Sequence, residues 1–148
     1  MRKHLKTAVI VLIAIFLIAQ AFRITKSNPP VRVDVGATSE VSPLLRRACY
    51  DCHSNETSWP WYSNVAPVSW LVGSDVSEAR SQLNFSEWGN YTLHEKTQRL
   101  KKIAKEVGDG DMPLWYYSLM HSKARLTDAE RNQIKDWADE ELARLRKN

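Results

Sequence analysis

The order of apolar and polar residues divides the chain into two regions. Residues 7–22 form an uncharged apolar run that only Gln20 interrupts, and Arg23 closes it. From about residue 41 onward, apolar residues recur three and four positions apart, as on one face of a helix. No segment shows the alternation that is typical of strands. The pattern therefore predicts an all-α protein.

The first two helices of the later region are predicted from proline positions. Ser42 is an expected N-cap with Pro43 at the first helical position, and apolar positions follow at Leu44, Leu45 and Ala48. Pro67 is expected to open a second helix. Its apolar face would contain Val68, Leu71, Val72, Val76, Ala79 and Leu83.

Two capping boxes predict the remaining long helices. Thr92 with Glu95 starts one, and Thr127 with Glu130 starts the other. Gly108 is expected to end the first of them. The apolar faces comprise Leu93, Leu100, Ile103, Ala104 and Val107 in the first, and Ile134, Trp137, Ala138, Leu142 and Leu145 in the second. In total, the sequence predicts four or five helices joined by aromatic-rich loops.

Composition changes along the chain suggest three parts. Residues 1–23 are a signal sequence or membrane anchor, residues 24–40 a tether, and residues 41–148 one small domain. The tether contains Ser27–Pro30, which cannot be helical, and lacks apolar periodicity. A domain of this size has a small core of its own, so six tryptophans would supply much of its bulk.

The N-terminus has the features of an export signal. Arg2, Lys3 and Lys6 precede the apolar run, as in a secretory signal peptide or an N-terminal anchor. As a helix, the run would span roughly 24 Å, against about 30 Å for a bilayer core. We expect a single anchor in the inner membrane with the domain in the periplasm. Cleavage near Ala21 would instead release the domain to the periplasm.

The net charge of +4 does not indicate nucleic-acid binding. Four basic residues that flank the apolar run account for all of it. The rest of the chain carries 17 basic and 17 acidic residues. The excess therefore reports membrane orientation through the positive-inside effect rather than a basic binding surface.

The strongest chemical signal is Cys49-Tyr50-Asp51-Cys52-His53. It has the C-x-x-C-H spacing of a c-type haem attachment site. Two thiols one helical turn apart can each bond one vinyl group of the same haem, and the histidine can supply the proximal iron ligand. These are the only two cysteines in the chain. We therefore expect one covalent haem c on Cys49 and Cys52, with His53 on the iron.

Three other uses of this motif were weighed. A thioredoxin-like redox pair would need a βαβ context, which is absent. A zinc site could use Cys49, Cys52, His53 and one more histidine as four ligands, but the second half of a zinc motif, a spaced Cys or His pair, is missing. A structural disulfide over so short a loop would be strained and would not need His53.

The distal iron ligand is expected to be Met112. It lies in the loop Gly108–Pro113, where glycines allow sharp turns and Pro113 stiffens the following residue. Methionine opposite histidine raises the reduction potential and suits electron transfer. The alternative is that Met112 only packs against Trp115. The other candidates are Met120, His94 and His121.

Further residues were considered as contacts of the haem. The aromatic run Trp59–Tyr62 follows the motif closely, so we expect it to complete the core and to contact the haem edge. Arg46 and Arg47 are candidates for pairing with haem propionates, or are simply solvated. His121 is expected to be a solvated loop residue.

Two segments resemble one family. CYDCHSNETSWPWYSNVAPVSWLVGSDVSEARSQLNFSEW and GDGDMPLWYYSLMHSKARLTDAERNQIKDWA are similar to the bacterial haem-binding domain family, over about residues 41–142. The resemblance implies a cytochrome c-like, all-α domain around one haem, with Met112 at the family's Met-Pro position. Many members have Met-Pro-Pro, whereas this chain has Leu114 after Pro113.

Three functions follow from these residues. The first is electron transfer with an unidentified redox partner protein, which needs two protein ligands on the iron. The second is a haem-based sensor or small-ligand-binding module with an open or labile sixth site. An enzyme such as a peroxidase is not expected, because His121 and Arg125 show no arrangement that singles them out.

Overall fold

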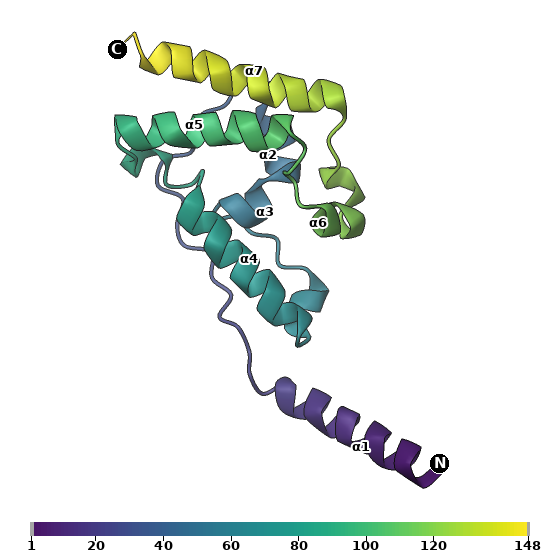
Figure 1. Cartoon of the computed structure of the whole chain (residues 1–148). Helices are drawn as coiled ribbons and strands as arrows, with labels where there is room; N and C mark the ends of the chain where they lie inside the picture. The colour runs from purple at the N-terminus through teal and green to yellow at the C-terminus, as the bar shows by residue number, and fades with distance from the viewer. Residues whose placement is uncertain (1, 148) are drawn as a thin grey trace.

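The protein is all-α, as the sequence predicts. The computed structural model describes residues 2–147 and contains seven α-helices and no strand in that range. Only an isolated bridge joins Val33 to Glu87. The helices, shown in Figure 1, are α1 (Arg2–Ala19), α2 (Ser42–Ala48), α3 (Tyr50–His53), α4 (Val68–Gln82), α5 (Leu93–Gly108), α6 (Trp115–Met120) and α7 (Asp128–Leu145).

Helices α5 and α7 pack side by side along their length and form the main core (Figure 1). Both predicted capping boxes are present, since the side chains of Thr92 and Thr127 accept from the third backbone N–H of each helix. The predicted end of α5 at Gly108 is also confirmed. The buried residues of the pair are Leu100, Ile103, Ala104, Val107, Ile134, Trp137, Ala138 and Leu142.

Helix α4 starts after Pro67 as predicted, but its apolar positions do not form a core. Only Ser69 and Val76 are buried in it, and Leu71 is 52% exposed. The helix contacts α3 and the turn after Pro60, and it crosses below α5 in Figure 1. Its inner face borders the cavity described below.

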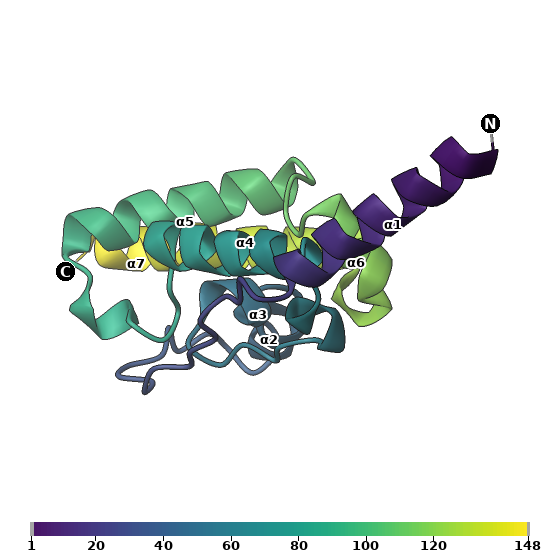
Figure 2. The same cartoon turned by 90° about the horizontal axis from the view of Figure 1, so that it is seen from below.

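Helix α1 stands apart from the other helices, and none of its residues is buried (Figures 1 and 2). It ends at Ala19 and includes Arg2, Lys3 and Lys6 in its first turns. Across residues 2–147, no helix combines the length and apolar character needed to cross a membrane. The transmembrane span predicted for residues 1–23 is therefore not found.

The segment expected to be a tether runs along the domain in extended form. Asn28 donates to the carbonyl of Thr57 at 2.8 Å, and the hydroxyl of Tyr50 donates to Asp34 at 2.6 Å. The backbone N–H of Arg32 donates to Ser86 O at 3.0 Å. Residues 28–34 are thus held against the loops around α3.

Two local predictions differ from the structure. Val41, not Ser42, is the N-cap of α2, and no side chain caps that helix. The stretch expected to be an aromatic-rich loop after Met112 contains the short helix α6, which has no buried residue. The backbone N–H of Ser118 bonds to Leu114 O at 3.0 Å and that of His121 to Tyr117 O at 2.9 Å.

Candidate functional site

A cavity of about 410 Å³ lies between α3, α4, α5 and the loop before α6. This volume is within the range of small-molecule and cofactor sites. All four residues predicted from the sequence line it, namely Cys49, Cys52, His53 and Met112. Apolar side chains supply much of the remaining wall, including Leu45, Ala48, Leu83, Phe85, Ile103 and Val107.

The two cysteines reach the cavity because one helical turn separates them. Cys49 caps the start of α3, and its carbonyl accepts from the N–H of Cys52 at 3.1 Å and of His53 at 2.8 Å. Both thiols are free. Burial raises the pKa of Cys49 to about 12 and that of Cys52 to about 11. Both groups are therefore neutral thiols near pH 7.

The imidazole of His53 is held in one tautomer by two carbonyls. Its Nδ1 lies 3.1 Å from Ala79 O at the end of α4 and 3.1 Å from Leu83 O. A carbonyl only accepts, so Nδ1 carries the proton and Nε2 keeps its lone pair. Burial also lowers the pKa of His53. A neutral ring with a free Nε2 is the form that binds a metal.

Phe85, in the segment that follows α4, also holds His53 in position. Its N–H donates to the carbonyl of His53 at 2.8 Å, and the two rings meet edge to face with centroids 6.4 Å apart. Phe85 is fully buried and stacks on Tyr50 at 5.1 Å. The segment after α4 therefore positions the histidine, a role that the sequence reasoning missed.

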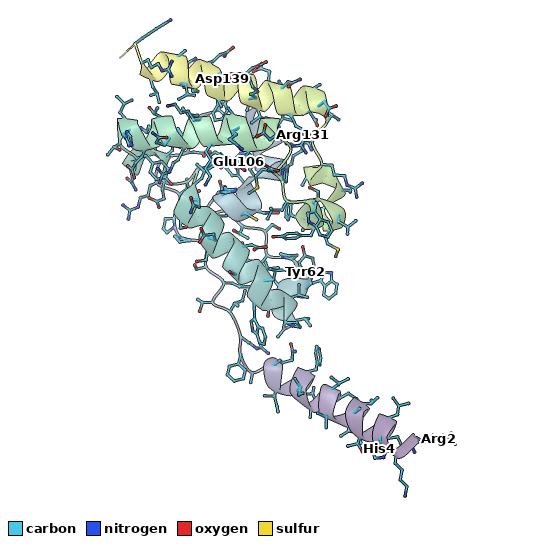
Figure 3. The ribbon with its side chains drawn as sticks, viewed as in Figure 1. Arg2, His4, Tyr62, Glu106, Arg131 and Asp139 are labelled. Atoms are coloured by element: carbon cyan, nitrogen blue, oxygen red, sulfur yellow. The ribbon has the colours of Figure 1, made fainter. Side chains whose placement is uncertain are left out.

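The loop that carries Met112 is anchored at two backbone atoms. The N–H of Met112 donates to Glu106 O at 3.0 Å, and its carbonyl accepts from Arg131 at 2.6 Å. Arg131 also donates to Val107 O at 3.2 Å. Figure 3 shows Arg131 on α7 near the end of α5 that carries Glu106. No local sequence pattern indicates this contact between α7 and the loop.

The aromatic run Trp59–Tyr62, predicted to contact the haem edge, is not among the residues that line the cavity. Tyr117 of α6 lines the cavity in its place, and Trp61 is 76% exposed. The hydroxyl of Tyr117 donates to Asp51 at 2.8 Å. This bond ties α6 to the residue between the two cysteines.

His121 is not a simply solvated loop residue. It is partly buried and stacks on Tyr117 with ring centroids 4.2 Å apart. Its Nδ1 donates to Tyr117 O at 3.1 Å, so its Nε2 accepts from the hydroxyl of Tyr62 at 3.2 Å. His121, His94 and Met120 are not among the residues that line the cavity.

The two arginines considered for propionates point elsewhere. Arg46 pairs with Asp34 at 3.1 Å and with Glu56 at 3.3 Å. Arg47 pairs with Glu130 and donates to the carbonyl of Arg125. The cavity wall instead contains Arg99 and Lys102, which α5 presents three positions apart beside Ile103 and Glu106.

The donor set fits a covalently held haem. The cavity brings together two neutral thiols, one neutral imidazole and one thioether in a mainly apolar wall. No cluster of three or more His, Cys, Asp and Glu side chains suited to a metal ion occurs in the described part of the chain. The zinc alternative therefore lacks a complete ligand set among these residues.

Comparison with known families agrees with this chemistry. A family model described as a haem-binding domain matches residues 8–140 of the chain. The matched range contains the two cysteines, His53 and Met112. No curated protein and no solved structure matches the chain.

Proposed function

The chain belongs to the haem-binding domain family, and from that premise we propose that it is a c-type electron-transfer protein. One haem c occupies the cavity, covalently bound to Cys49 and Cys52. The observation that carries this proposal is the convergence of both thiols, His53 and Met112 on one cavity. The residues come from two regions about 60 positions apart in the sequence, so spacing alone does not explain their meeting.

The thiols provide the covalent attachment. Each S–H would add across one vinyl double bond of the haem, with sulfur on one vinyl carbon and hydrogen on the other. The helical turn from Cys49 to His53 presents both sulfur atoms and the imidazole on one wall. The bound haem supplies one-electron chemistry at its iron.

His53 and Met112 would hold the haem iron. The carbonyls of Ala79 and Leu83 orient the imidazole and keep its proton on Nδ1. This bond raises the basicity of the ligating nitrogen. The Met112 sulfur belongs to a side chain that packs partly against the core cluster. A His/Met pair favours a high reduction potential.

The anchoring of Met112 favours electron transfer over sensing. A sensor needs a sixth ligand that leaves readily, whereas the backbone of Met112 is bonded to both α5 and α7. A ligand held on two sides keeps its position in both oxidation states, which lowers the reorganisation that electron transfer requires. The alternative function is a haem-based sensor in which the sixth site is open or labile.

We further propose that the domain works on the periplasmic side of the inner membrane and is not an enzyme. The basic N-terminus and the apolar run of residues 7–22 support export. Attachment of haem to C-x-x-C-H takes place on that side of a bacterial membrane. The expected partners are redox proteins, which would dock where the haem edge is exposed.

A pair of methionine variants tests the proposal. Met112→Ala should convert a low-spin spectrum to a high-spin one and lower the reduction potential. Met120→Ala is the matched control, because Met120 is 61% exposed and does not line the cavity. An unchanged spectrum and potential in Met112→Ala would show that Met112 is not the ligand.

A second pair of variants tests covalent attachment separately. Cys49→Ala combined with Cys52→Ala should release all haem to acidified solvent extraction. Wild-type protein should retain its haem in the same procedure. Haem that stays bound in the double variant would contradict the assignment of the two thiols.

A further inference from the structure

Arg99 is a partly buried cation at the cavity, and its guanidinium forms no close hydrogen bond within residues 2–147. Its side chain is 18% exposed, and its Nε is buried with no hydrogen-bond partner among the described residues. A buried donor without an acceptor is unfavourable in a folded protein. The residue lines the cavity together with Lys102.

The neighbours of Arg99 hold its position but do not pair its charge closely. The guanidinium stacks on the ring of Tyr91 at 3.8 Å from the centroid. The nearest carboxylate is Glu95, at 3.8 Å, which is longer than a hydrogen bond. Glu95 is already committed to the capping box, where it accepts from the N–H of Thr92 at 2.8 Å. The stacked ring therefore preorganises a guanidinium with free donors.

Lys102 adds a second cation on the same wall. Its Nζ donates to the neutral amide oxygen of Gln82 at 3.1 Å, which leaves the charge without a carboxylate partner in that bond. The other titratable groups that line the cavity are Cys49, Cys52 and His53 around α3, Asp75 and Glu78 on α4, Glu106 on α5 and Tyr117 on α6.

The acidic groups of the cavity have their own partners. Asp75 accepts from the hydroxyl of Tyr116 at 3.0 Å, and Glu78 accepts from Gln82 at 2.9 Å. Glu106 lies 3.9 Å from Lys105. None of these carboxylates forms an ion pair with Arg99 or Lys102 within 4.0 Å. The wall thus presents two cations that can bind the carboxylates of a ligand.

We propose that Arg99 and Lys102 form the subsite that binds the propionate carboxylates of the haem. Arg99 would bind one propionate through its terminal guanidinium nitrogens, since a planar guanidinium suits a carboxylate. Lys102 acts as a point charge at the more exposed side. The inference rests on the proposed haem site and adds two residues that fix the orientation of the haem within it.

The subsite also affects the redox behaviour. A positive charge near the iron favours the reduced haem, because the reduced haem carries one positive charge less than the oxidised haem. An opposite charge within about 4–6 Å lowers the pKa of a carboxyl group by about 1–3 units. The propionates are therefore expected to stay ionised throughout the pH range in which the protein works.

The experiment compares haem-loaded full-length variants by potentiometry from pH 4 to pH 9. Arg99→Gln should lower the midpoint potential at pH 7. It should also move the propionate-linked step in the potential upward by about one pH unit or more. Lys102→Gln should produce the same two shifts with smaller magnitude. Lys101→Gln, an exposed charge on the same helix that does not line the cavity, should produce neither.

The outcomes separate the two proposals. Wild-type protein without covalent haem would contradict the proposed function itself. Arg99→Gln could carry as much haem as wild type and match Lys101→Gln in potential and pH profile. That result would overturn the subsite and leave the proposed function standing. Because Arg99→Gln also removes the stacking on Tyr91, Arg99→Lys and Lys102→Gln are measured beside it. If all variants fold, carry haem and match wild type in potential, the propionates bind elsewhere.

Discussion

Helices α5 and α4 are similar in length, but their inner faces pack against different parts of the molecule. Helix α5 packs its apolar stripe on α7, and Leu100 and Ile134 in that interface are both fully buried. Helix α4 buries only Ser69 and Val76, and its inner side lines the cavity. The comparison indicates that α5 is stabilised by another helix, and we expect α4 to be stabilised further by a group bound in the cavity.

The difference extends to what each region contributes to the site. The α5–α7 pair supplies a fixed wall, including Val107, and anchors the Met112 loop through Arg131. The other wall consists of α3 and α4, where Ala79 and Leu83 hold His53. A haem bound between these walls would contact the well-buried α5–α7 pair on one side and the less buried α3 and α4 on the other.

The largest expected effect comes from removing the haem. The double variant Cys49→Ala with Cys52→Ala should lose protection from amide hydrogen exchange across α4, while α5 and α7 keep theirs. Local stability follows the number of buried apolar contacts, and α4 has few of them within the protein. Equal loss of protection in α4 and α5 would show that the two regions do not differ as described.

The next effect tests the helix pair. Ile134→Ala should lower the free energy of unfolding by about 2–5 kcal/mol, because it leaves a cavity in the buried interface. Denaturant unfolding followed by circular dichroism measures this loss. Leu71→Ala on α4 is the control and should cost far less, since Leu71 is 52% exposed. A similar cost for both would remove the distinction between the interfaces.

A smaller effect is expected from alkaline pH on the haem-free protein. Burial raises the pKa of Cys49 to about 12 and of Cys52 to about 11, above the ordinary value of 9.0. The unfolded chain therefore loses these protons first as the pH rises. The stability is fully present below pH 9 and declines between pH 9 and pH 12. By pH 10 the loss should be about 1 kcal/mol for each thiol.

The measurement is denaturant unfolding at pH 8 and pH 10. The double serine variant of Cys49 and Cys52 should lack this part of the pH dependence, and so should the haem-attached protein. Partly buried tyrosines such as Tyr117, whose pKa is raised by desolvation, contribute in the same direction and remain in the control. An identical pH dependence in the serine variant would contradict the burial of the thiols.

The smallest effect concerns the helix caps. Thr127→Ala removes the cap of α7 and should lower the free energy of unfolding by about 1 kcal/mol. Thr92→Ala should cost a similar amount at the start of α5. Thr127→Ser retains the hydroxyl and should stay near wild type. A serine variant as unstable as the alanine variant would point to packing rather than capping.

Local signals predicted the helices well. Capping boxes at Thr92 and Thr127 act within four residues, so the sequence contains all that is needed to recognise them. The same holds for the stop at Gly108. The motif Cys49–His53 and the Met112 loop could also be identified as local patterns, and the structure brings them to the same cavity.

The missed features depend on contacts between distant segments. Arg131 reaches Met112 across 19 positions, and Arg99 faces the cavity only because α4 and α5 border it from two sides. The apolar spacing of α4 predicted a buried face, but of those positions only Val76 is buried, while Ala79 and Leu83 line the cavity. Likewise, short spacing from Cys52 suggested that Trp61 would reach the site, yet α6 occupies that place through Tyr117.

The visible spectrum of the full-length protein, matured with haem in a bacterial periplasm, tests the central claim most directly. It is recorded oxidised, reduced, and reduced under carbon monoxide. We expect a low-spin spectrum that carbon monoxide does not change, because in the proposed function His53 and Met112 both ligate the iron. A high-spin spectrum, or rapid binding of carbon monoxide, would contradict this ligation and favour the sensor function.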